Sequence, residues 1–113
     1  MILSRVLYQE ETRELAFGAI GAGYLALGDP LGAPARSILF MNLTDVTIRF
    51  TDDPLKEGFS LPSGAGYALD ISSNRESDEG FVAPRGKQYY IKAGDGLPSS
   101  GRVEMTPFTS EEV

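Results

Sequence analysis

Short segments of this chain alternate apolar with polar residues, and turn-forming residues separate one segment from the next. In residues 45–51 every second side chain is apolar, and residues 88–92 and 102–108 repeat the same period. A period of two places alternate side chains on opposite faces of a β-strand, so that each segment can bury one face. Residues 59–61 and 67–71 show the same pattern over shorter lengths. The alternation predicts β-strands along most of the chain.

Residues 37–43 carry a run of apolar side chains with little alternation. A run of this length predicts a strand that is covered on both faces. The sequence Asn-Leu-Thr-Asp follows at residues 42–45, and Asn and Asp favour turns because they tolerate left-handed backbone and bond to it locally. We therefore expect a hairpin that joins this strand directly to the strand at residues 45–51.

Residues 13–27 are compatible with a helix or with two strands. Their alanines tolerate a helix, but Gly18, Gly21 and Gly23 would each cost about 1 kcal/mol relative to Ala in a helix interior. The apolar positions also lean towards a period of two. We expect two strand segments joined near the last two glycines, followed by a proline-containing loop at residues 29–34.

Short strands spaced about every ten residues, without a convincing helix, are typical of a sandwich or a barrel. We predict an all-β fold of about eight to ten strands, an antiparallel β-sandwich of the jelly-roll kind. Residues 1–113 are expected to form a single domain. Within it, residues 1–8 would form an N-terminal arm and residues 109–113 a frayed acidic tail. Pro107 predicts an edge strand or a strand end, because proline has no N–H for a ladder.

The composition of the chain limits the classes of function that it can have. The chain has no histidine and no cysteine, which excludes disulfides, thiolate nucleophiles, Ser-His-Asp chemistry and the commonest metal ligands. An enzyme is therefore not expected, and neither is a cofactor. The net charge of −6 disfavours nucleic acid or an anionic membrane as a partner, since both attract cations. Residues 1–8 are too short for a secretory signal, and Arg5 interrupts them, so we expect synthesis in the cytoplasm.

Two acidic loops are candidates for a cation site. Asp52, Asp53 and Glu57 offer the oxygen ligands that calcium prefers, but their spacing matches no EF-hand loop. An adjacent Asp pair beside a proline is more often solvated surface. We interpret the acidic residues 76–79 as solvated surface too, because Arg75 already offers them a local counter-charge. We predict no metal site at either loop.

Three other motifs are assigned structural roles. Asp70 and Glu104 are the carboxylates that a glycosidase pair would need, yet both lie on predicted strand faces that point away from the core. The glycines of residues 18–23 lack the Gly-Lys-Ser/Thr of a phosphate loop, so close backbone packing or a bulge is expected there. Residues 42–44 form a glycosylation sequon, which we interpret as part of the hairpin. No catalytic or modification site is predicted from them.

Most of the five tyrosines lie on alternating strands, where the ring fills the core and the hydroxyl reaches the rim. Tyr90 differs, because it lies on the face opposite Tyr89 and Ile91. Neighbouring subunits often cover an aromatic ring placed in this way. Tyr90 is therefore a candidate interface residue.

A series of short segments rich in strand and turn residues follows in a set order. They are residues 3–7 (LSRVL), 38–50 (ILFMNLTDVTIRF), 59–64 (FSLPSG), 69–74 (LDISSN), 80–81 (GF), 89–92 (YYIK) and 98–103 (PSSGRV). Their order and spacing resemble the small virion proteins of tailed bacteriophages that are found among the structural genes of the head–tail region. The resemblance covers residues 37–108 and the opening segment.

This resemblance implies a β-sandwich building block that assembles into symmetric rings or sleeves on the particle, without catalysis. It transfers no functional residue. Its implied partners are further copies of the chain and other phage structural proteins, and its implied location is the virion. Residues 29–35 and 52–57 depart from the pattern, because the similar proteins look more apolar or glycine-rich there.

The N-terminal arm is the expected interface, because a terminal apolar segment can pair with the open sheet edge of another subunit. Two alternatives remain open: a capsid decoration protein with the same fold, and a carbohydrate-binding module of a host-recognition fibre. The candidate interface residues are Leu3, Val6, Leu7, Tyr8 and Tyr90.

Overall fold

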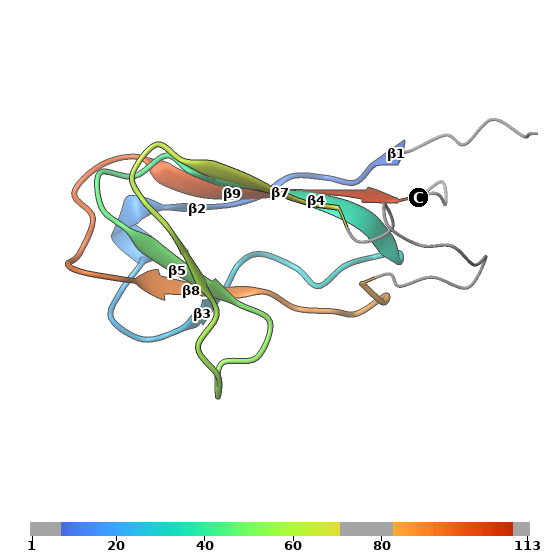
Figure 1. The fold of residues 1–113 in the computed structure, drawn as a ribbon, viewed down its shortest axis with the longest axis horizontal. Helices are drawn as coiled ribbons and strands as arrows, with labels where there is room; N and C mark the ends of the chain where they lie inside the picture. Colours follow the sequence, from blue (N-terminus) through green and yellow to red (C-terminus); the bar gives the residue numbers. More distant parts are fainter. Residues whose placement is uncertain (1–7, 71–82, 110–113) are drawn as a thin grey trace, which may run out of the picture.

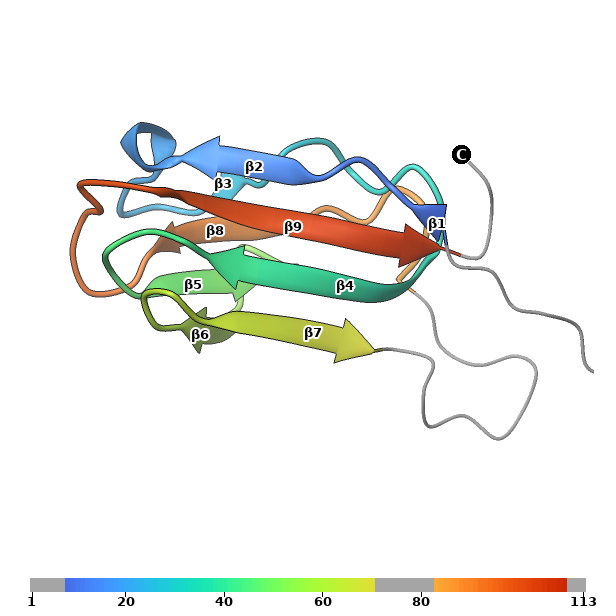
Figure 2. The same cartoon turned by 90° about the horizontal axis from the view of Figure 1, so that it is seen from above.

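The computed structural model describes residues 8–70 and 83–109, which form two antiparallel β-sheets packed face to face. Figure 1 shows the two layers from the side, and Figure 2 shows the upper layer from above. We call the layer that contains β9 sheet A and the layer that contains β8 sheet B.

Sheet A has the order β1-β9-β4-β7, and β2 pairs with β9 on the same side as β1. Its strands are β1 (Tyr8–Gln9), β2 (Arg13–Ala16), β4 (Ala35–Asn42), β7 (Gly66–Asp70) and β9 (Arg102–Thr109). Sheet B has the order β3-β8-β5-β6. Its strands are β3 (Leu25–Ala26), β5 (Ile48–Thr51), β6 (Phe59–Leu61) and β8 (Tyr90–Ala93).

From β2 to β9 the chain moves from one sheet to the other at every connection except one, the β5–β6 hairpin within sheet B. Two four-stranded antiparallel sheets connected in this way make a jelly roll, to which β1 adds a short pairing along β9. The predicted all-β sandwich is therefore confirmed.

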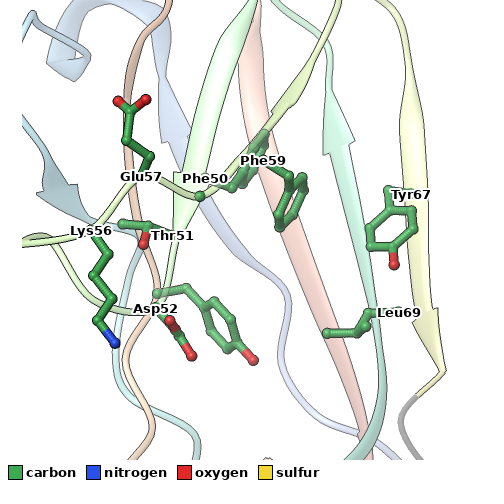
Figure 3. A pocket seen from close by; sticks show the side chains of 10 residues that line it. Phe50, Thr51, Asp52, Lys56, Glu57, Phe59, Tyr67 and Leu69 are labelled. Atoms are coloured by element: carbon green, nitrogen blue, oxygen red, sulfur yellow. The ribbon is translucent and has the colours of Figure 1, made fainter.

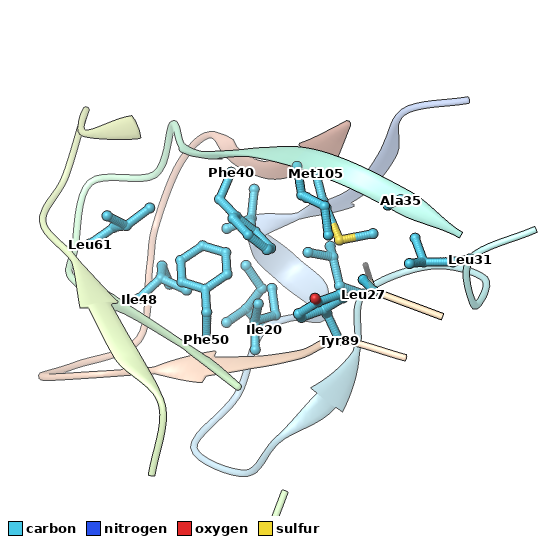
Figure 4. Close-up of a cluster of buried hydrophobic side chains, with 14 residues drawn as sticks. Ile20, Leu27, Leu31, Ala35, Phe40, Ile48, Phe50, Leu61, Tyr89 and Met105 are labelled. Atoms are coloured by element: carbon cyan, nitrogen blue, oxygen red, sulfur yellow. The ribbon is translucent and has the colours of Figure 1, made fainter. Parts of the chain in front are cut away.

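The core lies between the two sheets (Figure 4). Val103 and Met105, which the two-residue period placed inward, are buried in sheet A. The ring of Phe40 makes edge contacts with Phe50 and Tyr89 of the opposite layer, with centroid distances of 5.4 and 5.3 Å. Packing of this kind across the gap holds the layers together. The largest buried side chains include Phe40, Phe50, Leu27, Leu31, Ile38, Ile48, Ile91 and Met105.

Strand β4 buries one face, and the prediction of two covered faces was wrong. Ile38 and Phe40 point into the core, whereas Leu39 between them is 36% exposed on the outer face of sheet A. No described element packs on that outer face. The apolar run therefore belongs to an ordinary sandwich strand with an apolar outer side.

The predicted hairpin at residues 42–45 is also wrong. Strand β4 pairs with β7 and β9 in sheet A, but β5 pairs with β6 and β8 in sheet B. The segment between them crosses from one layer to the other. Its Asn and Asp do not adopt left-handed backbone, since no non-glycine residue of the described chain has a positive φ.

Asn42 has a different role in that crossing. Its side chain is fully buried, and Nδ2 donates hydrogen bonds to the carbonyls of Val46 at 2.8 Å and Leu61 at 2.9 Å. Its Oδ1 accepts hydrogen bonds from the backbone N–H of Thr44 at 3.0 Å and from its hydroxyl at 2.6 Å. The amide therefore uses both donors and both acceptor positions. Because Asn42 is fully buried, the asparagine of the sequon is not accessible for glycosylation.

Pro107 lies in the middle of sheet A, although it predicted an edge strand or a strand end. β4 pairs with it on one side at Ile38, and on the other side its carbonyl accepts the N–H of Glu10 at 2.9 Å. The N and O of one strand residue point to the same neighbour. The missing N–H of Pro107 therefore falls in the break between β1 and β2, where the ladder is already interrupted.

The two strand segments predicted in residues 13–27 are present as β2 and β3, one in each sheet. A single 3-10 turn, η1 (Phe17–Ala19), follows β2. A Cβ at Gly18, Gly21 or Gly23 would meet open space within 4 Å. The expectation of close backbone packing at these glycines was therefore wrong, and they serve a loose connection between the layers.

A buried ion pair anchors the proline-containing loop that precedes β4. Arg13 pairs with Glu10, and both side chains are almost fully covered. Arg13 also donates to the carbonyls of Asp29 at 3.1 Å and Pro30 at 2.8 Å. Oε1 of Glu10 accepts the N–H of Gly32 at 3.0 Å. These contacts fix the loop against the start of sheet A.

The ends of the described chain belong to sheet A. Tyr8, the last residue of the predicted arm, pairs with Thr109 of β9. Thr109, the first residue of the predicted tail, is fully buried inside that strand, so the frayed tail does not begin there. Residues 1–7 and 110–113 lie outside the described residues.

Candidate functional site

An apolar cleft opens along one long side of the sandwich, between β7 of sheet A and the β5–β6 hairpin of sheet B. Its volume is about 340 Å³. Figure 3 shows Tyr67 and Leu69 on β7 facing Phe59 and Phe50 across the gap. The cleft is lined by Phe50, Thr51, Asp52, Lys56, Glu57, Gly58, Phe59, Tyr67, Leu69 and Tyr89.

The cleft exists because the two layers are unequal at this side. Strand β6 has three residues, whereas β7 above it has five. The register pairs Tyr67 with Phe40 and Leu69 with Ile38, which places both β7 side chains on the core-facing side of sheet A. Sheet B does not cover them fully, and Tyr67 remains 44% exposed. Side chains with a core-facing position thus form part of the surface.

The walls of the cleft are packed aromatic rings. Phe50 and Phe59 stack with centroids 5.2 Å apart and planes 6° from parallel. Phe59 contacts Tyr67 at 5.3 Å and Phe40 at 5.4 Å. Phe40 is fully buried, so this chain of rings connects the cleft to the core. The apolar floor is consequently held in place before any partner binds.

Charged side chains surround the apolar floor on the sheet B side. Asp52 pairs with Lys87 at 2.8 Å, and Glu57 pairs with Arg49 at 3.2 Å. Tyr89 lies beneath this rim, where burial, with a further contribution from Asp52, raises its pKa to about 12. Its hydroxyl therefore stays protonated over the physiological range.

The outer edge of β7 borders the cleft. β7 pairs with β4 on one side, and no described residue pairs with it on the other. Apart from Asp70 at its end, its sequence carries no charged residue and no proline, the residues that usually protect an edge strand. The cleft and the unpaired edge form one continuous site, which we call the β7 edge site.

The sequence-predicted interface residues lie elsewhere. Tyr90 is half-buried on the outer face of sheet B, opposite Thr51 and Ala26 in the neighbouring strands. Tyr8 is half-buried in β1, at the opposite edge of sheet A from β7. Leu3, Val6 and Leu7 lie outside the described residues. The structure therefore brings no two of the described candidates together.

The acidic candidates are placed as follows. Oδ1 of Asp53 accepts the N–H of Leu55 at 3.0 Å. Within residues 8–70 and 83–109, no group of three or more His, Cys, Asp or Glu is arranged to hold a metal ion.

Asp70 and Glu104, the candidate glycosidase pair, lie two strands apart and are in register with Ser37 and Met41 of the intervening β4. This backbone offset of about 14 Å along the strand exceeds the spacing of a glycosidase pair. Residues 75–79 lie outside the described part of the chain.

Sequence reasoning missed the β7 edge site. The alternation placed Phe59, Tyr67 and Leu69 on core-facing sides, and their register agrees with that. A period of two reports which face a residue occupies, but not whether the opposite layer extends far enough to cover it. The short β6 followed by a turn at residues 62–65 was the only signal.

Comparisons with known proteins give no relative for this chain. No protein-family model matches it, and no significant match exists among curated proteins or solved structures. In the part of the chain that the structure describes, no helix has the length and apolar character needed to cross a membrane.

Proposed function

We propose that this chain is a structural subunit of a tailed-bacteriophage virion, which forms a homo-oligomeric ring or sleeve in the head–tail region and acts without catalysis. The observation that carries the proposal is the pair of sheet A edges, since no described residue pairs with the outer side of β7 or of β2. Unpaired edges are sites where another chain can add a strand. The sequence resemblance supplies the phage context.

The strand directions favour a head-to-tail contact between copies. β2 is antiparallel to β9, β9 to β4, and β4 to β7, so β2 and β7 run in opposite directions. The edge of sheet A that carries β1 and β2 in one copy can therefore supply an antiparallel strand to β7 of the next copy. A contact between two different surfaces closes into a ring or propagates as a helical sleeve. Both outcomes fit the proposed location.

The fold adds support at a coarser level. Jelly rolls serve as viral capsid subunits and as lectins, among other roles. A fold alone does not determine function, so the unpaired edges and the cleft are the more specific support. The absence of histidine and cysteine from the sequence also suits a role that needs binding surfaces and no acid–base or thiol chemistry.

Locating the chain in the intact particle tests this proposal. We expect density for a two-layered sandwich in a ring or sleeve at the head–tail axis, with tens of copies per particle. Hundreds of copies spread over the shell would instead indicate the alternative of a capsid decoration protein. Absence of the chain from purified particles would contradict both assignments.

The cleft favours a second candidate function, that of a carbohydrate-binding module on a host-recognition fibre. Tyr67 and Phe59 offer aromatic surface, and Asp52, Lys56 and Glu57 supply polar groups at the rim. Apolar clefts with a few polar groups at the rim are the usual form of small-ligand sites. A glycan array would detect such binding, and Tyr67→Ala should abolish it. Silence on the array would leave the structural role as the better assignment.

A further inference from the structure

We propose that the β7 edge site binds residues 1–7 of a second copy of this chain. This inference rests on the proposed homo-oligomer and names the surface and the segment that would form it. In the complex, the arm adds as an extended strand along β7 and directs alternate side chains into the cleft. Strand addition of this kind combines backbone hydrogen bonds with side-chain pockets.

The receiving surface supplies both elements. Every second residue of an edge strand points its N–H and C=O away from the sheet, and no described residue satisfies those of β7. Beside this edge, Phe59, Tyr67 and Leu69 leave apolar surface exposed to solvent. An added strand would cover this surface, because its side chains alternate between the inner and outer faces.

The arm has a suitable composition. Of its seven residues, only Arg5 is charged, whereas the whole chain carries a net charge of −6. A cationic segment therefore meets a partner of net negative charge. Its branched apolar residues are Ile2, Leu3, Val6 and Leu7.

The arm of the same copy is too short for this position. Residues 1–7 join β1 at Tyr8, and three strand spacings separate β1 from β7 within sheet A. The position beyond β7 is one spacing further, which makes about 19 Å at the usual distance between strands. Seven extended residues span about 24 Å at most, so only one or two would remain to pair with β7. A neighbouring copy is free of this limit.

The positions of the arm and its receiving edge also determine how the copies would link. The arm leaves from the β1 edge of sheet A, and the receiving site is at the opposite edge. Each copy therefore contributes its own arm at one edge of sheet A and binds the arm of a neighbour at the other edge. Contacts of this type are heterologous and link copies in one direction until a ring closes or a sleeve grows.

Cysteine trapping tests the contact, because the chain has no cysteine of its own. One variant carries Ser4→Cys in the arm, and a second carries Ala68→Cys on β7, because both positions lie on the outer face of the sheet when Leu3 points into the cleft. The two are mixed under mild oxidation, and disulfide-linked pairs are quantified by mass spectrometry. The control replaces Ala68→Cys with Leu97→Cys, which is well exposed in the loop before β9 and lies at the far end of that strand from Tyr8. We expect the first mixture to give about tenfold more linked pairs than the control, through the raised local concentration.

Deletion of residues 1–7 and two point variants complete the test. The deletion and Leu3→Asp should keep the far-ultraviolet spectrum of a β protein but shift the chain to monomer in size-exclusion chromatography with light scattering. Ser4→Asp makes the same charge change at a polar position of the arm and should associate more strongly than Leu3→Asp. An oligomer that survives the deletion, with no preference for position 68 in trapping, overturns this inference and leaves the proposed function standing. A full-length chain that is monomeric throughout overturns both.

Discussion

The ring of Tyr67 lies 5.3 Å from that of Phe59, across the space between the two sheets at their open side. Phe59 in turn contacts the fully buried Phe40. The same chain of aromatic contacts therefore runs from the centre of the core to the surface. A partner that covers Tyr67 would extend the core of the sandwich, which is how an extended segment can bind to this domain with little rearrangement.

Tyr67→Ala should separate association from folding. Because Tyr67 is 44% exposed, we expect the variant to lose about 1 kcal/mol of unfolding free energy, against about 3–5 kcal/mol for Phe40→Ala. Oligomers should nevertheless dissociate, as measured by light scattering. Leu97→Ala is the control, since Leu97 is 66% exposed in the loop before β9. Equal association of both variants with wild type would argue against the β7 edge site.

Asn42→Ala should be among the most destabilising single changes in the chain. It removes four hydrogen bonds from a fully buried amide and leaves the carbonyls of Val46 and Leu61 without that partner. We expect a loss of about 3 kcal/mol, because each buried group left unsatisfied costs about 1–3 kcal/mol. Urea unfolding measures this value. Ser63→Ala offers a milder comparison, since it removes one bond to the Thr44 carbonyl.

The Glu10–Arg13 pair should contribute far more to stability than the pair of Arg49 and Glu57. Both members of the first pair are covered, whereas the side chain of Glu57 is 76% exposed. Arg13→Ala leaves a buried carboxylate and is expected to cost about 3–5 kcal/mol. Glu57→Gln should cost about 1 kcal/mol or less, because surface ion pairs are weak. Chemical denaturation of the two variants side by side would reveal comparable losses if the anchoring role were wrong.

Alkaline pH should destabilise the protein through Tyr89. Its pKa is raised to about 12 by burial, whereas the unfolded chain titrates near its ordinary value of 10. Above pH 10 the unfolded state binds fewer protons than the folded state, so stability falls as the pH rises towards 12. The full effect is about 2–3 kcal/mol and is absent below pH 9. Tyr89→Phe should remove this part of the alkaline loss, and an unchanged pH profile in urea titrations would contradict it.

The two-residue period predicted the core well, because a strand that buries one face must alternate. Val103, Met105, Ile48 and Phe50 were placed correctly for that reason. The same signal does not assign strands to sheets. Asn42 looked like a turn residue, but its side chain bonds across the layers, and only long-range contacts could show this.

Pro107 illustrates a second limit. Proline predicts an edge, yet the break between β1 and β2 makes a central position possible. That break depends on how a distant segment pairs with β9, which local sequence does not encode. The β7 edge site was missed for a similar reason, since its openness follows from the length of β6 relative to β7.

The mass of the full-length chain in solution tests the central claim most directly. Sedimentation equilibrium over a wide concentration range should show association from the 12.2 kDa monomer towards one oligomer of fixed mass or towards longer sleeves. A single species of 12.2 kDa at every concentration would contradict the account.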